Sequence, residues 1–437
     1  MGPEALLQYM WQHRLWDPRR CLTTDGRRIT VLDPGLANPH AGPDFFNAKL
    51  RIGSDLWAGN VEIHCRASDW HRHHHTDDPA YHTVVLHVVA ESDCIITRPD
   101  GSVIAQMVMP HAPDFRERYS AMVDSDAAPA CRDELAATPS IYITDWVTAL
   151  GIERMHAKAD RVMAWHAELD SDWRATAYIA LARALGFGTN SDAFELLARI
   201  TPLRHLLRHS DDPALLEAAL MGQAGMLDRV DRHSLEPGPE QDYYERIVAH
   251  HRFLSAKYGW PASPRPAWRM ARMRPPNQPR RRIALLAALL ADGFPAGRRI
   301  YNLDSLDAAR RLLDVPLPSY WREHHDYGCR TAAVRTALSA SSVTTVIINA
   351  VVPLIYARSR VMGDEQAAAR AVDMLTALPP EDNTIVRRFA SAGIPVPDAF
   401  TSQALIQLHT GYCNTRKCLY CRLGHRYLTA RAMPFPR

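Results

Sequence analysis

The sequence predicts an α+β protein, in which a mixed sheet near the N-terminus is followed by mainly α-helical domains. Between residues 27 and 110, short runs rich in valine and isoleucine alternate with turns, as strands do. From about residue 140, apolar residues recur at three- and four-residue spacings, as in amphipathic helices. The 437 residues exceed one typical core, so we expect more than one domain.

The N-terminal elements follow in a simple order. A first helix is expected near residues 4–12, with Leu6, Leu7, Met10 and Trp11 on one side. Strands are expected at 27–33, 45–52 and 56–64, with a hairpin turn at 53–54. After a histidine-rich loop come a strand at 83–91 and a hairpin made by 94–97 and 102–110.

Helical periodicity continues through the rest of the chain and is interrupted once. Helices are expected at 141–169, 175–187, 191–200 and 212–225. A segment rich in proline and arginine, 261–282, interrupts them. We therefore expect four parts: an α/β domain at 1–125, a helical domain at 140–260, a basic linker or docking segment at 261–282, and a helical domain at 283–437 that ends in a cysteine-rich metal knuckle.

The composition is that of a globular protein, with 47% hydrophobic and 23% charged residues. A net charge of +3 does not by itself imply a polyanionic partner. The first sixteen residues have no basic region followed by an apolar run, so no secretory signal is expected. The apolar stretch 343–357 is too short for a membrane span. We expect a cytoplasmic protein without a membrane partner; the sequence does not define its oligomeric state.

One group of polar residues has the spacing of a metal-dependent catalytic site. Asp44 follows Pro43 at the start of a strand, and Glu62 and His64 lie two residues apart on the next strand, on one face. Two such carboxylates hold Mg²⁺ or Mn²⁺, which lowers the pKa of a bound water. The alternative is structural: Asp44 ends a turn, Glu62 forms a surface salt bridge and His64 packs at a sheet edge.

The loop after this strand is unusually rich in histidine and aspartate. Within nineteen residues it contains Asp69, His71, His73, His74, His75, Asp77, Asp78, His82 and His87. Imidazole and carboxylate at this density suit Zn²⁺, Mn²⁺ or Fe²⁺. We expect His71, His73 and His75 to be metal ligands or phosphate contacts, and His87 to be a core histidine. A solvated histidine tract without metal is the alternative.

Three of the eight cysteines cluster near the C-terminus, as Cys413-x4-Cys418-x2-Cys421. The C-x2-C half is the tight turn that lets two thiolates bind one ion. We expect Zn²⁺ or an iron–sulfur cluster here in a structural role, with His425 or Cys329 as the fourth ligand. The alternative is three reduced cysteines at a helix end.

A basic stretch carries the residues expected to contact nucleic acid. They are Arg269, Arg272, Arg274, Arg280, Arg281 and Arg282, in a segment without an acidic residue. Guanidinium groups bind phosphate through paired hydrogen bonds, and a local patch suffices even when the net charge is small. The alternative is that these arginines pair with carboxylates on neighbouring helices.

Two resemblances follow from these motifs. Asp44 after proline, then Glu62-x-His64 on the next strand, resembles the PD-(D/E)XK restriction-endonuclease-like superfamily, whose core runs helix, three strands, helix, strand. That resemblance implies two metal carboxylates, a further carboxylate at Glu4, and His64 where the family has lysine; some of these nucleases also carry an iron–sulfur cluster on three C-terminal cysteines. Segments such as EALLQYMWQHRL, AGPDFFNAKLRI and SQALIQLHTGYCNTRKCLYC resemble the uncharacterised bacterial family DUF2851 over nearly the whole chain.

Together these patterns predict a metal-dependent phosphodiesterase that acts on DNA or RNA. His64 departs from the superfamily pattern, because a histidine near its ordinary pKa is mostly neutral where lysine is a permanent cation. Two other classes remain open: a non-catalytic nucleic-acid or protein adaptor with a degenerate nuclease fold, and a metal-dependent hydrolase of small molecules that uses the histidine cluster.

Overall fold

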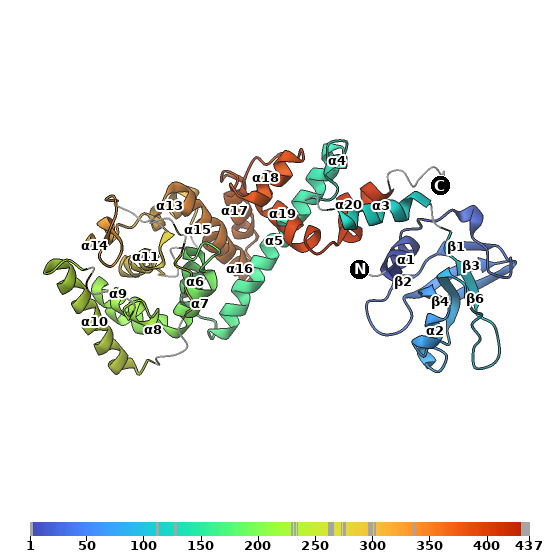
Figure 1. Ribbon diagram of the computed structural model, residues 1–437, viewed down its shortest axis with the longest axis horizontal. Helices are drawn as coiled ribbons and strands as arrows, with labels where there is room; N and C mark the ends of the chain where they lie inside the picture. The colour runs from blue at the N-terminus through green and yellow to red at the C-terminus, as the bar shows by residue number, and fades with distance from the viewer. Residues whose placement is uncertain are drawn as a thin grey trace. The chain divides into compact units, whose positions relative to one another are not determined.

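The protein divides into two compact units (Figure 1). The computed structural model describes residues 3–429 apart from 111–112, 126–128, 229, 231–232, 234, 261–265, 272, 274–276, 296–299, 301–302 and 335–337. Met1–Val147, Arg387–Pro395 and Ile406–Arg437 form the sheet unit. Thr148–Val386 and Val396–Leu405 form the helical unit.

A six-stranded mixed sheet is the centre of the sheet unit. Its strands are β1 (Ile29–Asp33), β2 (Leu36–Ala37), β3 (Phe45–Ile52), β4 (Asp55–Arg66), β5 (Val84–Glu91) and β6 (Ala105–Val108). The order is β1-β3-β4-β5-β6, and β2 also pairs with β3. Pairs up to β4 are antiparallel, whereas β4–β5 and β5–β6 are parallel. The strands expected at 27–33, 45–52, 56–64 and 83–91 are therefore confirmed.

The expected hairpin after residue 91 is wrong in part. Thr97 and Val103 form one isolated antiparallel bridge, and β6 pairs with β5 in parallel. The turn between them allows Ile96 and Ile104 to be buried with Trp70. Tertiary packing, rather than local strand pairing, therefore determines the conformation of this segment.

The two faces of the sheet have different roles. Helix α1 (Pro3–Gln12) packs its apolar side on the face formed by Val61 and Ile63, in one core cluster. Glu62 and His64 alternate with these residues and point to the opposite face. There the segment after β4, with α2 (Asp69–Arg72) and the short η2 (Pro79–Tyr81), packs over the sheet.

Helices and the C-terminal segment complete the sheet unit. They are α3 (Pro113–Asp124), α4 (Arg132–Leu135), the start of α5 (Ser140–Glu168), α18 (Thr384–Ser391), η7 (Leu408–Cys413), η8 (Cys418–Tyr420) and α20 (Arg422–Thr429). Leu419 and Leu428 join the same core as Phe115 and α1. The expected domain at 283–437 is thus divided, since its C-terminal segment belongs to the sheet unit.

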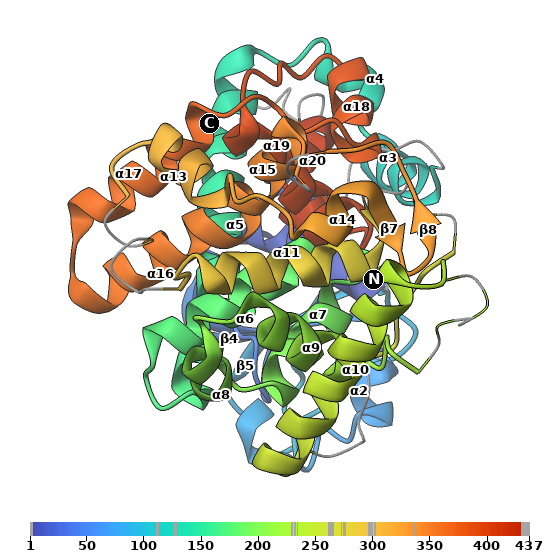
Figure 2. The ribbon, with the colours of Figure 1, turned by 90° about the vertical axis from the view of Figure 1, so that its left-hand side faces the viewer.

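The helical unit is built mainly of α-helices around α11. In chain order its helices are α5, α6 (Trp173–Leu185), α7 (Ser191–Ile200), α8 (Leu203–Leu206), α9 (Pro213–Gln223), α10 (Pro239–Tyr258), α11 (Pro279–Ala291), α13 (Leu306–Leu313), α14 (Ser319–Glu323), α15 (Ala340–Val346), α16 (Val352–Met362), α17 (Glu365–Thr376) and α19 (Ala399–Gln407). The pair β7 (His324–Asp326) and β8 (Cys329–Arg330) lies among them. Figure 2 shows α11 crossing the middle of this unit.

One helix of this unit has the length and composition of a membrane span. Ala340–Met362 runs through α15, a π-helical turn at Ile347–Val351 and α16. It is longer than the apolar run 343–357 seen in the sequence. However, 61% of its apolar window is buried within the protein, as in the core helix of a folded domain.

The last three arginines of the basic segment are buried, which differs from the exposed surface that the sequence suggested. Arg280, Arg281 and Arg282 lie in the first turn of α11 and are 6%, 1% and 1% exposed. Arg280 Nη1 donates to both oxygens of Asp326, at 2.5 and 2.6 Å. Because α11 is apolar around its whole circumference, its first turn enters the core together with its guanidinium groups.

Of the other three arginines named in this segment, the structure describes only one. Arg269 is exposed, while Arg272 and Arg274 lie outside the described residues. The prediction of an exposed basic surface therefore fails for three of the six arginines. For Arg280, the alternative of an ion pair with a neighbouring element holds.

Candidate metal centre

Strand register places the first two candidate residues. Glu62 and His64 point to the same face of β4, and Glu62 lies opposite His87 on β5. Glu62 and His64 are 5% and 1% exposed, so this polar group is inside the protein. Burial of polar groups is costly unless they are hydrogen-bonded or bind a metal. The neighbouring side chains therefore determine whether Glu62 and His64 are hydrogen-bonded within the protein or are available to a metal.

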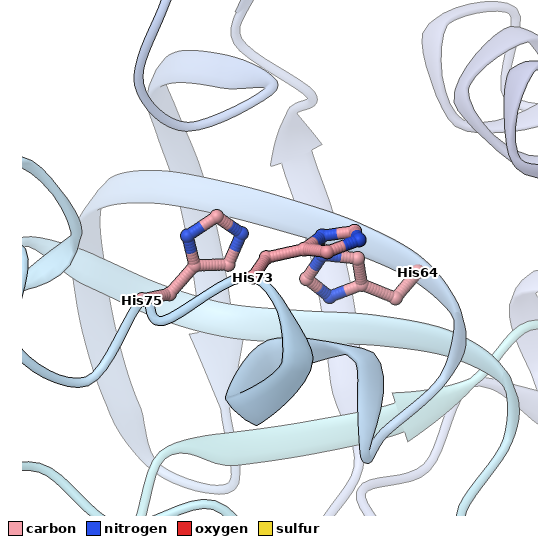
Figure 3. A group of neighbouring side chains, drawn as sticks. All are labelled: His64, His73 and His75. Atoms are coloured by element: carbon pink, nitrogen blue, oxygen red, sulfur yellow. The ribbon is translucent and has the colours of Figure 1, made fainter.

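A specific turn brings two loop histidines to this face. Helix α2 ends at Arg72, His73 is its C-cap, and His74 adopts the left-handed conformation, with φ +60°. The amide of His75 then bonds back to the carbonyl of Trp70 at 3.1 Å, which is the closing bond of a Schellman motif. This reversal places His73 and His75 beside His64, as Figure 3 shows.

Three imidazoles and one carboxylate meet at this point. The ligand nitrogens of His64, His73 and His75 lie within 4.8 Å of one another. His64 Nε2 is 3.1 Å from His73 Nδ1 and 3.4 Å from Glu62 Oε1. His75 Nε2 is also 3.4 Å from Glu62 Oε1 and, within the part of the chain described, makes no hydrogen bond. Such a buried nitrogen without a partner is the kind of atom that a metal ion satisfies.

Asp44 lies next to this group but is already engaged by the protein. Its Oδ1 accepts a bond from Gln8 of α1 at 2.9 Å, and its Oδ2 accepts one from the Ile63 amide at 3.0 Å. Its own amide donates to Glu62 Oε2 at 3.0 Å. Glu4, at the start of α1, is close enough to raise the pKa values of both Asp44 and Glu62.

A chain of hydrogen bonds sets the tautomer of His64. Gln106 Nε2 donates to Ser92 Oγ at 2.7 Å, which leaves Gln106 Oε1 to accept from His87 Nδ1 at 3.2 Å. His87 Nε2 then accepts from His64 Nδ1 at 2.9 Å. As a result, the lone pair of neutral His64 is on Nε2, which faces Glu62 and His73. Second-shell partners commonly orient metal-binding histidines in this way.

Burial determines the charge state of the group without metal. It raises the pKa of Asp44 to about 7, with a further rise from Glu62, and raises the pKa of Glu62 to about 8. It lowers the pKa of His64 to about 2 and that of His87 to about 4. Near neutral pH, His64 and His87 are therefore uncharged, while Glu62 and a part of the Asp44 carboxyl groups hold protons that a cation would displace.

We expect metal affinity to increase as the pH rises through the pKa values of about 7 and about 8 for Asp44 and Glu62. Each proton that must leave contributes up to about tenfold per pH unit. Titration calorimetry with Mn²⁺, in buffers of different ionisation enthalpy, would count the protons released. An affinity that does not change with pH would contradict these assignments.

Stability without metal has the opposite dependence for these two groups. The carboxyls ionise near 3.8 and 4.5 in the unfolded chain but at higher pH in the folded protein. Between those limits the folded state holds more protons, so these groups reduce stability as the pH rises.

Replacing Gln106 with leucine should weaken metal binding by about ten- to a hundredfold. The change removes the acceptor that holds the His87 proton on Nδ1, so that His64 no longer has a defined tautomer. Gln106→Glu keeps an acceptor at this position and serves as the matched control. The measurement is competition for Mn²⁺ with a chelating dye. Equal affinity of the leucine variant and the wild type would show that this chain has no such role.

The structure separates the expected site residues into two sets. Asp44, Glu62, His64, His73 and His75 lie together, whereas His71 is exposed and outside the group of ligand nitrogens. The positions of His87 and Gln106 as supports were not foreseen, because a core histidine and a strand glutamine carry no recognisable motif. Only the parallel pairing of β4, β5 and β6 brings them into line.

The C-terminal cysteines also lie together, with a partner that the sequence did not suggest. Cys413, Cys418 and Cys421 line one cavity with Cys131, which precedes α4. Neither expected fourth ligand is with them. His425 Nδ1 is hydrogen-bonded to the Tyr9 hydroxyl and its ring lies against His13, and Cys329 belongs to the helical unit.

The fold and this site define a class of α+β protein in which a mixed sheet carries a buried cluster of carboxylate and histidine side chains, followed by a helical region. No curated protein and no solved structure matches the chain. The chain belongs to the family described as "Protein of unknown function (DUF2851)", whose sequence model matches residues 4–384.

Proposed function

We propose that the sheet unit is a metal-dependent phosphodiesterase that acts on DNA or RNA. The observation that carries the proposal is the convergence of Glu62 with His64, His73 and His75, beside Asp44. Carboxylate and imidazole ligands on a sheet, with a neighbouring second carboxylate, are the components of metal-assisted hydrolysis.

The order of elements also supports this proposal. Helix α1, the antiparallel strands β1, β3 and β4, the short helix α2 and the parallel strand β5 follow the order of a restriction-endonuclease-like core. Asp44 stands immediately before β3, and Glu62 and His64 lie on β4, where that superfamily has its acidic pair and its third residue. A fold resemblance alone does not define an activity, so the argument rests on the site.

The donor set fits a transition metal better than Mg²⁺. Three imidazole nitrogens together with a carboxylate suit Mn²⁺, Zn²⁺ or Fe²⁺, whereas Mg²⁺ prefers oxygen ligands. His75 Nε2, which makes no hydrogen bond among the described residues, and the lone pair on His64 Nε2 would both be satisfied. A metal bound here would lower the pKa of a water molecule and stabilise charge on a phosphate.

The residues of the site have different roles in this proposal. Glu62 and the three histidines would hold the metal. Asp44, whose two oxygens already accept hydrogen bonds, positions Glu62 through its amide and would add negative charge once a cation displaced its proton. His64 serves as a ligand and does not replace the lysine cation, since its imidazole is neutral.

Arg72 supplies the positive charge that His64 lacks. Its side chain is 69% exposed, and its charge acts on both Glu4 and His64. It is held in place by Asp69, 2.9 Å away, whose other oxygen accepts the Arg66 amide. A guanidinium so placed would bind a substrate phosphate at the exposed edge of the cluster, where His73 is also exposed.

The test is cleavage by the full chain of four substrates: duplex DNA, single-stranded DNA, single-stranded RNA and a chromogenic phosphodiester. Each is incubated with Mn²⁺, Zn²⁺, Fe²⁺ under anaerobic conditions, or Mg²⁺. We expect cleavage of a nucleic acid with Mn²⁺ and a weaker Mg²⁺ reaction. Salt-dependent binding without turnover under any metal would replace the proposal with the adaptor, and turnover of only the small ester would favour the small-molecule hydrolase.

A further inference from the structure

Four of the cysteines of the sheet unit line a single cavity. Its volume is about 150 Å³, and its lining includes Cys131, Cys413, Cys418 and Cys421. A cavity needs only about 10–15 Å³ to hold one water molecule, so this space is on the order of ten times larger. All four cysteines are free thiols, and Cys421 is 6% exposed.

Two chain segments converge to bring these thiols together. Cys131 lies just before α4; in the C-terminal segment, Cys413 ends η7, Cys418 begins η8 and Cys421 follows η8. The thiol of Cys131 is within electrostatic range of those of Cys421 and Cys418, although it is far from them in the sequence. The spacing of the C-terminal trio predicted a metal site that was one ligand short, and Cys131 completes a set of four.

The backbone around the C-x2-C turn is arranged for sulfur ligands. The Cys421 amide bonds to the Cys418 carbonyl at 3.3 Å, which closes the turn. The backbone amides of Gly424 and Leu423 lie near the sulfur of Cys421 and act to lower the pKa of its thiol, against the larger rise from burial. Gly424 is needed there, because a Cβ at its position would lie 2.3 Å from the Cys418 carbonyl oxygen. Amide hydrogen bonds to cysteine sulfur also tune iron–sulfur centres.

The spacing of the thiols distinguishes between the two metal chemistries. In a tetrahedral zinc site with Zn–S bonds of about 2.3 Å, the sulfurs lie roughly 4 Å apart. Over the described residues, the group of ligand atoms within 4.8 Å of one another is that of His64, His73 and His75, and the cysteines form no such group. Four thiols that line one large cavity, with no three of the sulfurs all within 4.8 Å of one another, suit a cluster in which each cysteine binds a different iron atom.

We propose that Cys131, Cys413, Cys418 and Cys421 bind a [4Fe–4S] cluster that fastens the C-terminal segment to the sheet unit. Each thiol loses its proton and forms one Fe–S bond, and the iron and sulfide come from outside the protein. Arg416, which also lines the cavity, offsets part of the negative charge of the four thiolates. The cluster joins segments that are distant in the sequence, where a cross-link removes much conformational freedom from the unfolded chain.

The experiment is anaerobic purification of the full chain, followed by iron, zinc and acid-labile sulfide analysis and Mössbauer spectroscopy. We expect about four iron atoms and four sulfides per chain. Cys131→Ser should lose at least half of both, while Cys329→Ser, the matched control in the helical unit, should retain them. A wild-type protein with one zinc and no sulfide, or full iron content in Cys131→Ser, would overturn the proposal.

A second measurement uses the wild-type chain, so that a folding defect of the variant cannot decide the result. The anaerobic protein is alkylated with iodoacetamide before and after removal of iron, and the modified peptides are mapped. We expect Cys131 to be protected together with the C-terminal trio, and Cys329 to be modified in both states. Modification of Cys131 in the iron-loaded protein would contradict its role as a ligand. These outcomes do not depend on the proposed phosphodiesterase activity.

Discussion

Glu62→Gln should reduce metal-dependent cleavage on the order of a thousandfold. The substitution keeps the shape of the side chain, and its amide oxygen can still accept the Asp44 amide hydrogen bond. It removes the carboxylate oxygen that lies 3.4 Å from both His64 Nε2 and His75 Nε2 and that would be negatively charged when a metal displaces its proton. Without that charge a divalent cation has only neutral nitrogens as its nearest partners. The measurement is the single-turnover rate at saturating Mn²⁺, with Mn²⁺ affinity determined separately.

Glu91→Gln is the control for this change. Glu91 is on the neighbouring strand β5, is 61% exposed and pairs with Arg66 at 3.3 Å. Because an exposed pair contributes little, this variant should cleave like the wild type and have the same stability. If Glu62→Gln also kept its cleavage rate and its Mn²⁺ affinity, the carboxylate–histidine cluster would not be the active site.

Arg280→Met should lower the free energy of unfolding of the helical unit by about 3 kcal/mol. Arg280 is 6% exposed and donates to both oxygens of Asp326, as well as to the Met226 carbonyl at 3.0 Å. Methionine replaces most of the aliphatic stem but leaves the Asp326 carboxylate and the carbonyl without this donor. Breaking a buried ion pair from one side is costly because the remaining charge stays in a poorly solvated place.

Urea unfolding followed by far-ultraviolet circular dichroism measures this loss. Since the chain has two units, the transition of the helical unit is assigned by hydrogen exchange of α11 amides. Arg269→Met, at an exposed position, is the control and should change stability by less than about 0.5 kcal/mol. A loss for Arg280→Met as small as that of the control would show that the ion pair contributes no net stability.

In the candidate site, local sequence patterns predicted some of the side-chain positions but not all of them. Two-residue alternation on β4 predicts that Glu62 and His64 share a face, and the structure agrees. Three of the loop histidines were named as ligands, yet the chain reversal at His74 decides that His73 and His75 face the site and His71 does not. A histidine in the left-handed conformation has no sequence signal that distinguishes it from its neighbours.

For the arginines of the basic segment, the local sequence pattern gave the wrong expectation about burial. A run of like charges usually marks a solvated face, and the sequence provides no reason for burial at Arg280–282. The carboxylate that pairs with Arg280 lies on β7, which meets α11 only in the folded helical unit. For this reason the sequence predicted a linker at 261–282 and a new domain from residue 283, whereas Arg280, Arg281 and Arg282 belong to the same helix as the apolar residues that follow them.

The sequence by itself determined the α+β class, the strands β1, β3, β4 and β5, and the family, because alternation, helical periodicity and motif spacing are local properties of the chain. The tertiary structure alone decided which side chains meet. The parallel register of β4, β5 and β6 aligns Gln106, His87 and His64, and two segments distant in the sequence line the cavity of the four cysteines. Such contacts depend on how apolar faces pack against one another, and no window of residues contains that information.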